Sequence, residues 1–293
     1  MFMNIVLFLI TATIWGSSWL IITFQLHACS VAVAIGWRFC LASLVLAVGC
    51  GITRTSLRIA PRHFGLLALL GLTLFGFNYW LVYLAEVRLP SGLVALSFTI
   101  LIAYNMIGES LFFKRSFNRV ALVGVGVGVS GLILVYFDYL PPAETRTQTT
   151  GAMMLAIGGA LCASVGNLLA EKVVQTRLQM VPMMSLAMGI GGVSMLALAA
   201  ISGDSLALPT SPIFLSGFLF LTLVGTVLGF LAYFALIVRV GASRAAYTTL
   251  GMPIIALGLS TMFEGLQWQT LSVIGVIGVL AGAFIMHLSR AKS

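Results

Sequence analysis

The chain has 293 residues, of which 60% are hydrophobic and 8% are charged, and its formal net charge is +8. A soluble domain carries about a quarter of its residues as charged side chains, so this composition excludes a soluble protein and predicts an integral membrane protein. The basic excess does not indicate nucleic-acid binding, because Lys and Arg are scattered over short loops instead of clustering on one face.

Long apolar runs recur along the whole chain. A membrane-spanning helix needs about 20 mostly apolar residues, and short loops between such runs make neighbours in sequence antiparallel neighbours in space. We therefore predict an all-α membrane protein with ten transmembrane helices. The ten expected spans are Asn4–Phe24, Val31–Cys50, Phe64–Ala85, Ser91–Phe113, Arg119–Phe137, Gly151–Ala170, Val181–Ile201, Ile213–Val238, Arg244–Phe263 and Thr270–Leu288.

The basic residues predict the orientation of these spans. Cytoplasmic loops carry an excess of Lys and Arg. With the N-terminus in the cytoplasm, only Arg88 and Arg146 fall outside, and Arg38 lies within the second run. The expected cytoplasmic residues are Arg54, Arg58, Arg62, Lys114, Arg115, Arg119, Lys172, Arg177, Arg239, Arg244, Arg290 and Lys292. We expect a multi-pass protein of the bacterial inner membrane with both termini in the cytoplasm.

The second half of the chain repeats the first. A shift of 151 residues (239 − 88) places Arg239 on Arg88, and the same shift places Gly282 on Gly131. We predict two repeats of five helices, residues 1–140 and 151–290. Because five is odd, the second repeat enters the membrane from the opposite face, and inverted repeats of this kind are typical of alternating-access transporters.

Glycine is dense in the fifth and tenth runs. The residues are Gly124, Gly126, Gly128, Gly131, Gly275, Gly278 and Gly282. Small residues at such spacings let helix backbones approach closely, either within one chain or in a homodimer. They do not form a phosphate-binding loop, because such a loop follows a strand and opens a helix.

Two charges lie deep in apolar runs, and such charges are costly unless paired or hydrated. Arg38 lies near mid-membrane, and Glu109 lies about 10 Å towards the cytoplasm, at 1.5 Å of rise per residue. One hypothesis makes Arg38 the site for a substrate carboxylate and Glu109 a protonatable coupling group. The alternative is structural: the two residues pair with each other, or reach towards the interface, and lock two helices together.

Polar and aromatic residues at similar depths supply further candidates for substrate contact. They are Trp15, Ser17, Asn78, Tyr79, Asn105, Asn167, Tyr233 and Tyr247. Trp15 and Asn78 each have a structural alternative, in which Trp15 fills the core and Asn78 bonds a neighbouring helix. The depth of Asn105 and Asn167 suggests a pair on the cytoplasmic side, with helix-to-helix bonding as the alternative. We expect Tyr83 to sit in the interfacial aromatic belt. Pro253 bends its helix, as a gating hinge or as a static kink.

Four short motifs lie at characteristic places in the runs: Ala12–Ser18 (ATIWGSS), Trp37–Phe39 (WRF), Leu89–Leu96 (LPSGLVAL), and Pro253 with Glu264. Together with the ten runs, they resemble the drug/metabolite transporter superfamily, and most closely its EamA-type branch. The resemblance covers nearly the whole chain. It implies uptake or export of small metabolites, often amino acids, through a central cavity lined by helices 1, 3, 4, 6, 8 and 9.

The first repeat departs from the family pattern. Ile102 stands where the family has a proline in the middle of the fourth helix. Phe113 stands where an acidic residue is usual near the end of that helix, and Glu109 is displaced inward.

The sequence predicts a secondary transporter that moves an amino acid or a similar neutral or zwitterionic solute, as an exporter. It has no nucleotide-binding loop, no metal-ligand cluster and no catalytic set, so we expect no cofactor, no metal and no enzymatic activity. The expected partners are the solute and the lipid bilayer. Two alternative functions are a lipid-modifying enzyme, which the scattered acidic residues disfavour, and a non-transporting subunit or sensor.

Overall fold

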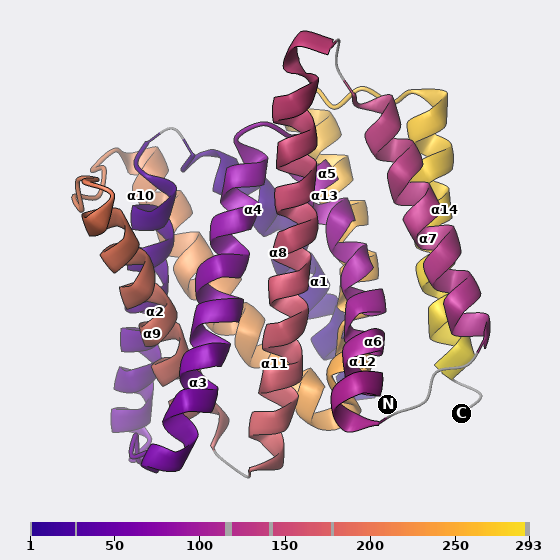
Figure 1. Ribbon diagram of the computed structural model, residues 1–293. Coiled ribbons are helices and arrows are strands. Elements are labelled where there is room, and N and C mark those ends of the chain that lie inside the picture. The colour runs from indigo at the N-terminus through magenta and orange to yellow at the C-terminus, as the bar shows by residue number, and fades with distance from the viewer. Residues whose placement is uncertain (1, 27, 115–118, 141–142, 177–178, 291–293) are drawn as a thin grey trace.

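The computed structural model describes residues 2–26, 28–114, 119–140, 143–176 and 179–290, and the regular secondary structure of this part of the chain is all helical (Figure 1). The elements in order are α1 (Phe2–Thr23), α2 (Val31–Ile52), η1 (Pro61–His63), α3 (Phe64–Leu70), η2 (Gly71–Phe77), α4 (Asn78–Glu86), α5 (Ser91–Ser97), η3 (Phe98–Ile100), α6 (Leu101–Phe113), α7 (Arg119–Asp138), α8 (Ala143–Gln175), α9 (Met180–Ile201), α10 (Pro212–Leu219), η4 (Phe220–Leu228), α11 (Gly229–Val240), α12 (Ala242–Ala245), α13 (Thr248–Phe263) and α14 (Thr270–Arg290).

The described helices confirm the all-helical membrane class. Eight helical stretches are long and apolar enough to cross a bilayer, and two further apolar helices, Thr248–Phe263 and Thr270–Met286, are shorter. The ninth predicted run does not form one continuous helix from Arg244. A four-residue helix, α12, ends at Ala245, and a turn at Ala246 and Tyr247 separates it from α13.

Two of the long helices contain a widened π-helical segment. These two segments are η2, between α3 and α4, and η4, between α10 and α11. In η4 the Thr226 hydroxyl donates to the carbonyl of Leu221, five residues back, at 2.8 Å. Such widened turns often occur at functional sites. Here η2 contributes Leu74 to the lining of the central cavity described below, and η4 bonds two lining residues, Arg38 through the Thr226 hydroxyl and Trp15 through the Gly225 carbonyl.

Glycine brings α7 and α14 into backbone contact. A Cβ atom added at Gly131 would lie 2.5 Å from the carbonyl oxygen of Gly275 and 2.6 Å from the nitrogen of Val279. A Cβ at Gly282 would lie 2.5 Å from the carbonyl oxygen of Gly124. The glycine faces of these two helices therefore pack on each other within one chain. The predicted homodimer stays a prediction.

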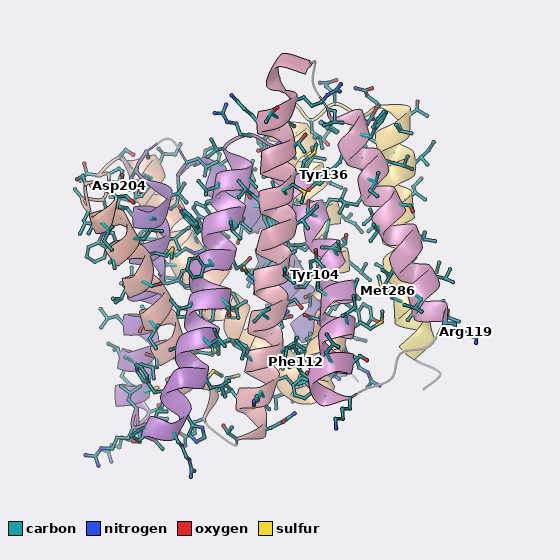
Figure 2. All side chains as sticks on the ribbon, viewed as in Figure 1. Tyr104, Phe112, Arg119, Tyr136, Asp204 and Met286 are labelled. Carbon is teal, nitrogen blue, oxygen red and sulfur yellow. The ribbon has the colours of Figure 1, made fainter. Side chains whose placement is uncertain are left out.

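The bundle has a helix pair at each edge. In Figure 1, α2 and α9 stand at the left and α7 and α14 at the right, and each pair is in close contact. Helix α1 begins and α14 ends at the same, lower end of the bundle, where Figure 2 also places Arg119, and Asp204 lies at the opposite end. Among the basic residues expected in the cytoplasm, Arg115, Arg177 and Lys292 lie outside the described residues.

Candidate functional site

A largely apolar cavity of about 70 Å³ lies in the middle of the bundle. By volume it has room for roughly five water molecules. Six of the long helical stretches and the shorter helix α13 contribute to its wall. The lining residues are Trp15, Ser18, Trp19, Ile22, Arg38, Leu74, Asn78, Tyr79, Val82, Phe98, Leu101, Ala163, Asn167, Phe230, Tyr233, Thr249 and Met252.

Arg38 is the charged group of this cavity, and its side chain is 1% exposed. Its Nε donates to the Thr226 hydroxyl at 2.8 Å, and its Nη1 donates to the Tyr83 hydroxyl at 3.1 Å. The guanidinium lies 4.8 Å from the centre of the Tyr79 ring, in cation–π geometry. These partners are all neutral. Arginine has five N–H donors, and the two hydrogen bonds occupy two of them.

Aromatic rings form the wall beside Arg38. The Trp15 indole donates to the carbonyl of Gly225 at 3.0 Å. The centroid of its ring lies 4.9 Å from that of Phe230 and 4.8 Å from that of Tyr233. The indole fits because Gly229 has no side chain: a Cβ there would lie 2.7 Å from the Trp15 Nε1. Trp15 therefore lies at the cavity wall, in a position to stack on a planar or apolar group.

Two polar side chains that border the cavity have a buried atom without a hydrogen-bond partner. The Asn78 amide nitrogen donates to the carbonyl of Leu74 at 3.2 Å, but the Asn78 Oδ1 is buried without a partner. The Tyr233 hydroxyl is also buried without a partner, close to Asn167 but outside hydrogen-bond geometry. Buried polar groups are normally satisfied, so these atoms are available to a ligand or to water.

The cavity gathers most of the residues predicted as contacts and leaves out three. Ser17 faces away from the lining, because its hydroxyl bonds the carbonyls of Thr13 and Ile14 on its own helix. Ser18, one residue and about 100° further round the helix, lines the cavity instead. The Tyr247 hydroxyl bonds the carbonyl of Met286, away from the cavity. Both amide atoms of Asn105 lack a partner, so the expected Asn105–Asn167 pair does not form.

Two structural interpretations made from the sequence are wrong. Arg38 donates to Thr226 and Tyr83, not to Glu109, because Glu109 lies on α6 outside the cavity lining. Tyr83 is not part of an interfacial belt, since its side chain is fully buried and its hydroxyl also donates to the Gln25 Oε1 at 3.1 Å. A single tyrosine near a helix end gives no indication of which side it faces.

Pro253 lies within α13, and its neighbour Met252 lines the cavity. Proline has no N–H to donate to the carbonyl four residues back, which here belongs to Thr249, another lining residue. This places a weakened turn of α13 at the cavity. The gating role of Pro253 remains a prediction.

Two carboxylates cap helix N-termini, a role that the sequence analysis did not assign to them. Glu264 accepts hydrogen bonds from the Ser91 backbone nitrogen at 3.2 Å and from the Ser91 hydroxyl at 2.6 Å, at the start of α5. Glu171 accepts one from the Ala242 nitrogen at 3.0 Å, at the start of α12. The two capped positions are 151 residues apart (242 − 91), the spacing of the repeat. Glu171 on α8 therefore supplies the cap in the second repeat, whereas the first-repeat counterpart of Glu264 is Phe113 (264 − 151), whose side chain has no hydrogen-bond acceptor.

Comparison with known proteins places the chain among transporters. The sequence profile of the EamA-like transporter family matches residues 2–137 and again residues 150–288. The chain is 27% identical to the uncharacterized inner membrane transporter YedA of Escherichia coli K12, over 93% of this chain and 86% of that protein. It is 21% identical to Protein PagO of Salmonella typhimurium, over 97% and 93% of the two chains.

The chain is also similar to a further transporter and to a solved structure. The chain is 21% identical to a probable amino-acid metabolite efflux pump of Salmonella typhimurium, over 94% of this chain and 92% of that one. A solved structure, described only as the crystal structure of a protein, aligns with 99% of this chain and 98% of its own at a TM-score of 0.70. At 13% identity this likeness shows the shared fold alone.

Proposed function

This chain belongs to the EamA-like transporter family, and from that premise we propose that it is a secondary transporter of a small zwitterionic or neutral solute, such as an amino acid. The solute occupies the Arg38 cavity and crosses by alternating access. The chain is an integral inner-membrane protein by its apolar helices and its relatives. Its homologues are named as transporters and not as enzymes.

The observation that carries the proposal is the environment of Arg38. A buried charge is costly unless an opposite charge or a hydrogen-bonding partner compensates it, and the hydrogen-bond partners of Arg38 are hydroxyl groups. A solute carboxylate would accept the remaining guanidinium donors as a bidentate pair. The apolar part of the same solute would then contact Trp15 and Phe230.

The predicted inverted repeats are supported by how the helices pack. The pairs α2·α9 and α7·α14 each join a helix to its counterpart in the other half, and α5·α13 joins the fourth predicted run to the ninth, which is its counterpart. Helix α1 packs on α11 and α13, as its counterpart α8 packs on α4 and α6. The two π segments also correspond, because η2 shifted by 151 residues begins at Thr222, inside η4. In this proposal ten spans form two five-helix repeats around the cavity, as in other inverted-repeat transporters.

The orientation with both termini in the cytoplasm is supported by the charges at the two ends. The loop between α2 and η1 carries Arg54 and Arg58 and lies at the lower end in Figure 1, as does Arg119 in Figure 2, whereas Asp204 lies at the upper end. An excess of Lys and Arg marks the cytoplasmic side. We also propose that the direction of transport is export. The relative that is named as a probable efflux pump supports this direction.

The proposal is tested by flux. The purified chain is reconstituted into liposomes, which are offered a panel of labelled amino acids and nucleobases. We expect saturable exchange of at least one zwitterionic solute and none with protein-free liposomes. If no solute of the panel moves while the protein is folded and correctly inserted, the transporter proposal fails, and a sensor or subunit that retains the fold becomes the better account.

A further inference from the structure

Glu86 stands apart from the other acidic side chains that the structure describes. It is the last residue of α4, its side chain is 5% exposed, and neither of its carboxylate oxygens has a hydrogen-bond partner. By contrast, Glu264 accepts from Ser91, and Asp138 accepts from the Ser272 nitrogen at 2.9 Å. Glu109 has an interaction of its own as well.

The surroundings of Glu86 oppose a negative charge. A buried carboxylate without a donor is strongly disfavoured in its ionised form. The residue closes the C-terminal end of α4, where the helix dipole is negative. Glu264, at the end of α13, lies near enough to repel it. A proton removes all three penalties at once.

The charged and titratable groups that act on Glu86 come from several elements. Glu264 comes from the end of α13 and Arg38 from α2, and Tyr83, which interacts electrostatically with Glu86, lies on the same helix. Among the helices packed on α4, the described residues of η2 and α5 include no acidic or basic side chain. Helix α8 carries Arg146, which is exposed, near its start, and Glu171 and Lys172 near its opposite end. Arg38 is therefore the cation that favours the negatively charged form of Glu86. Its own hydrogen bonds, however, go to Tyr83 and Thr226.

A short chain of contacts connects Glu86 to the cavity. Tyr83 lies one helical turn before Glu86, which puts the two residues on one face of α4. The Tyr83 hydroxyl accepts from Arg38 and donates to Gln25, whose amide nitrogen is buried without a partner. A change of charge at Glu86 is therefore felt at Arg38 through one intervening side chain.

We propose that Glu86, and not Glu109, is the proton-binding group of this transporter. The carboxylate takes up one proton as this end of the bundle closes over it, and releases that proton when the end opens and water reaches the side chain. No bond other than the O–H bond forms or breaks. The inference rests on the proposed transport function for its use, but the proton site itself is a property of the protein at rest.

Infrared difference spectroscopy of the purified protein in lipid tests the site without any solute. Near neutral pH we expect the carbonyl stretch of a protonated, buried carboxylic acid in the wild type and in Glu109→Gln, and its loss in Glu86→Gln. Glu86→Asp keeps a titratable acid and is expected to keep a shifted band, which guards against a folding defect in the glutamine variant. Persistence of the band in Glu86→Gln, or its absence from the wild type, would overturn the proposal.

A flux measurement then tests the coupling separately. With a solute that the wild type carries, a pH gradient across the liposome is expected to change the rate severalfold, whereas Glu86→Gln exchanges the solute at a rate independent of the gradient. A gradient dependence that survives in Glu86→Gln contradicts the coupling role. If the wild type carries no solute at all, the transport proposal fails, while the infrared result still decides whether Glu86 binds the proton.

Discussion

Replacement of Arg38 with Gln is expected to weaken binding of a carboxylate-bearing solute by roughly 10- to 150-fold. Each hydrogen bond to a charged group contributes about 1.5–3 kcal/mol, and about 1.4 kcal/mol corresponds to a factor of ten. Gln can still reach a neighbouring hydroxyl, but it lacks the charge and the planar fork that pair with a carboxylate. The apparent affinity in the liposome flux assay measures this change directly.

Matched variants separate binding from folding. Arg38→Lys keeps the positive charge without the fork, so we expect an intermediate affinity. Thr226→Val removes the hydroxyl that accepts from the Arg38 Nε and leaves the guanidinium in place. It is therefore expected to have a smaller effect than Arg38→Gln. Normal accumulation of Arg38→Gln together with an unchanged apparent affinity would show that Arg38 does not bind the solute.

Replacement of Gly131 with Leu is expected to cause the largest loss of stability among single glycine substitutions on α7. Its Cβ would lie 2.5 Å from the carbonyl oxygen of Gly275 and 2.6 Å from the nitrogen of Val279, which are backbone atoms and cannot rotate away. Overpacking usually costs about 1–3 kcal/mol, and a clash with backbone belongs at the upper end of that range. The thermal unfolding midpoint in detergent is the measurement.

Gly126 on the same helix provides the control. A Cβ at Gly126 would meet nothing within 4 Å, and the residue is exposed on the side away from α14. Gly126→Leu adds the same side chain to the same helix, so a decrease in the unfolding midpoint confined to Gly131→Leu is the expected pattern. Equal decreases in both variants would mean that the contact between α7 and α14 does not stabilise the fold.

The general architecture was accessible from the sequence because membrane spans depend on length and apolarity alone. Nine of the ten predicted runs correspond to described helical stretches, and the ninth run in sequence is broken at Ala246 and Tyr247. The glycine spacings of the fifth and tenth runs also correctly indicated close packing. The length of a run, its apolarity and the spacing of its glycines can all be read directly along the sequence, without knowledge of the fold.

The site was predicted only in part, because the rotational position of a side chain is not a linear property. A shift of one residue turns a helix position by about 100°, which is why Ser18 lines the cavity and Ser17 does not. The π segments add further rotation that no local sequence signal revealed. Glu86 was overlooked because a carboxylate at the end of a run looks solvent-exposed until neighbouring helices cover it.

The central claim is that one cavity halfway through the bundle opens in turn to each side of the membrane. Ala163 lines this cavity and is 4% exposed. In a background without the native cysteines Cys29, Cys40, Cys50 and Cys162, Ala163→Cys can be treated with a membrane-impermeant thiol reagent in vesicles of each orientation. Alternating access predicts modification from both sides, each slowed by a transported solute. Modification from one side alone, in a variant that still carries solute, would contradict it.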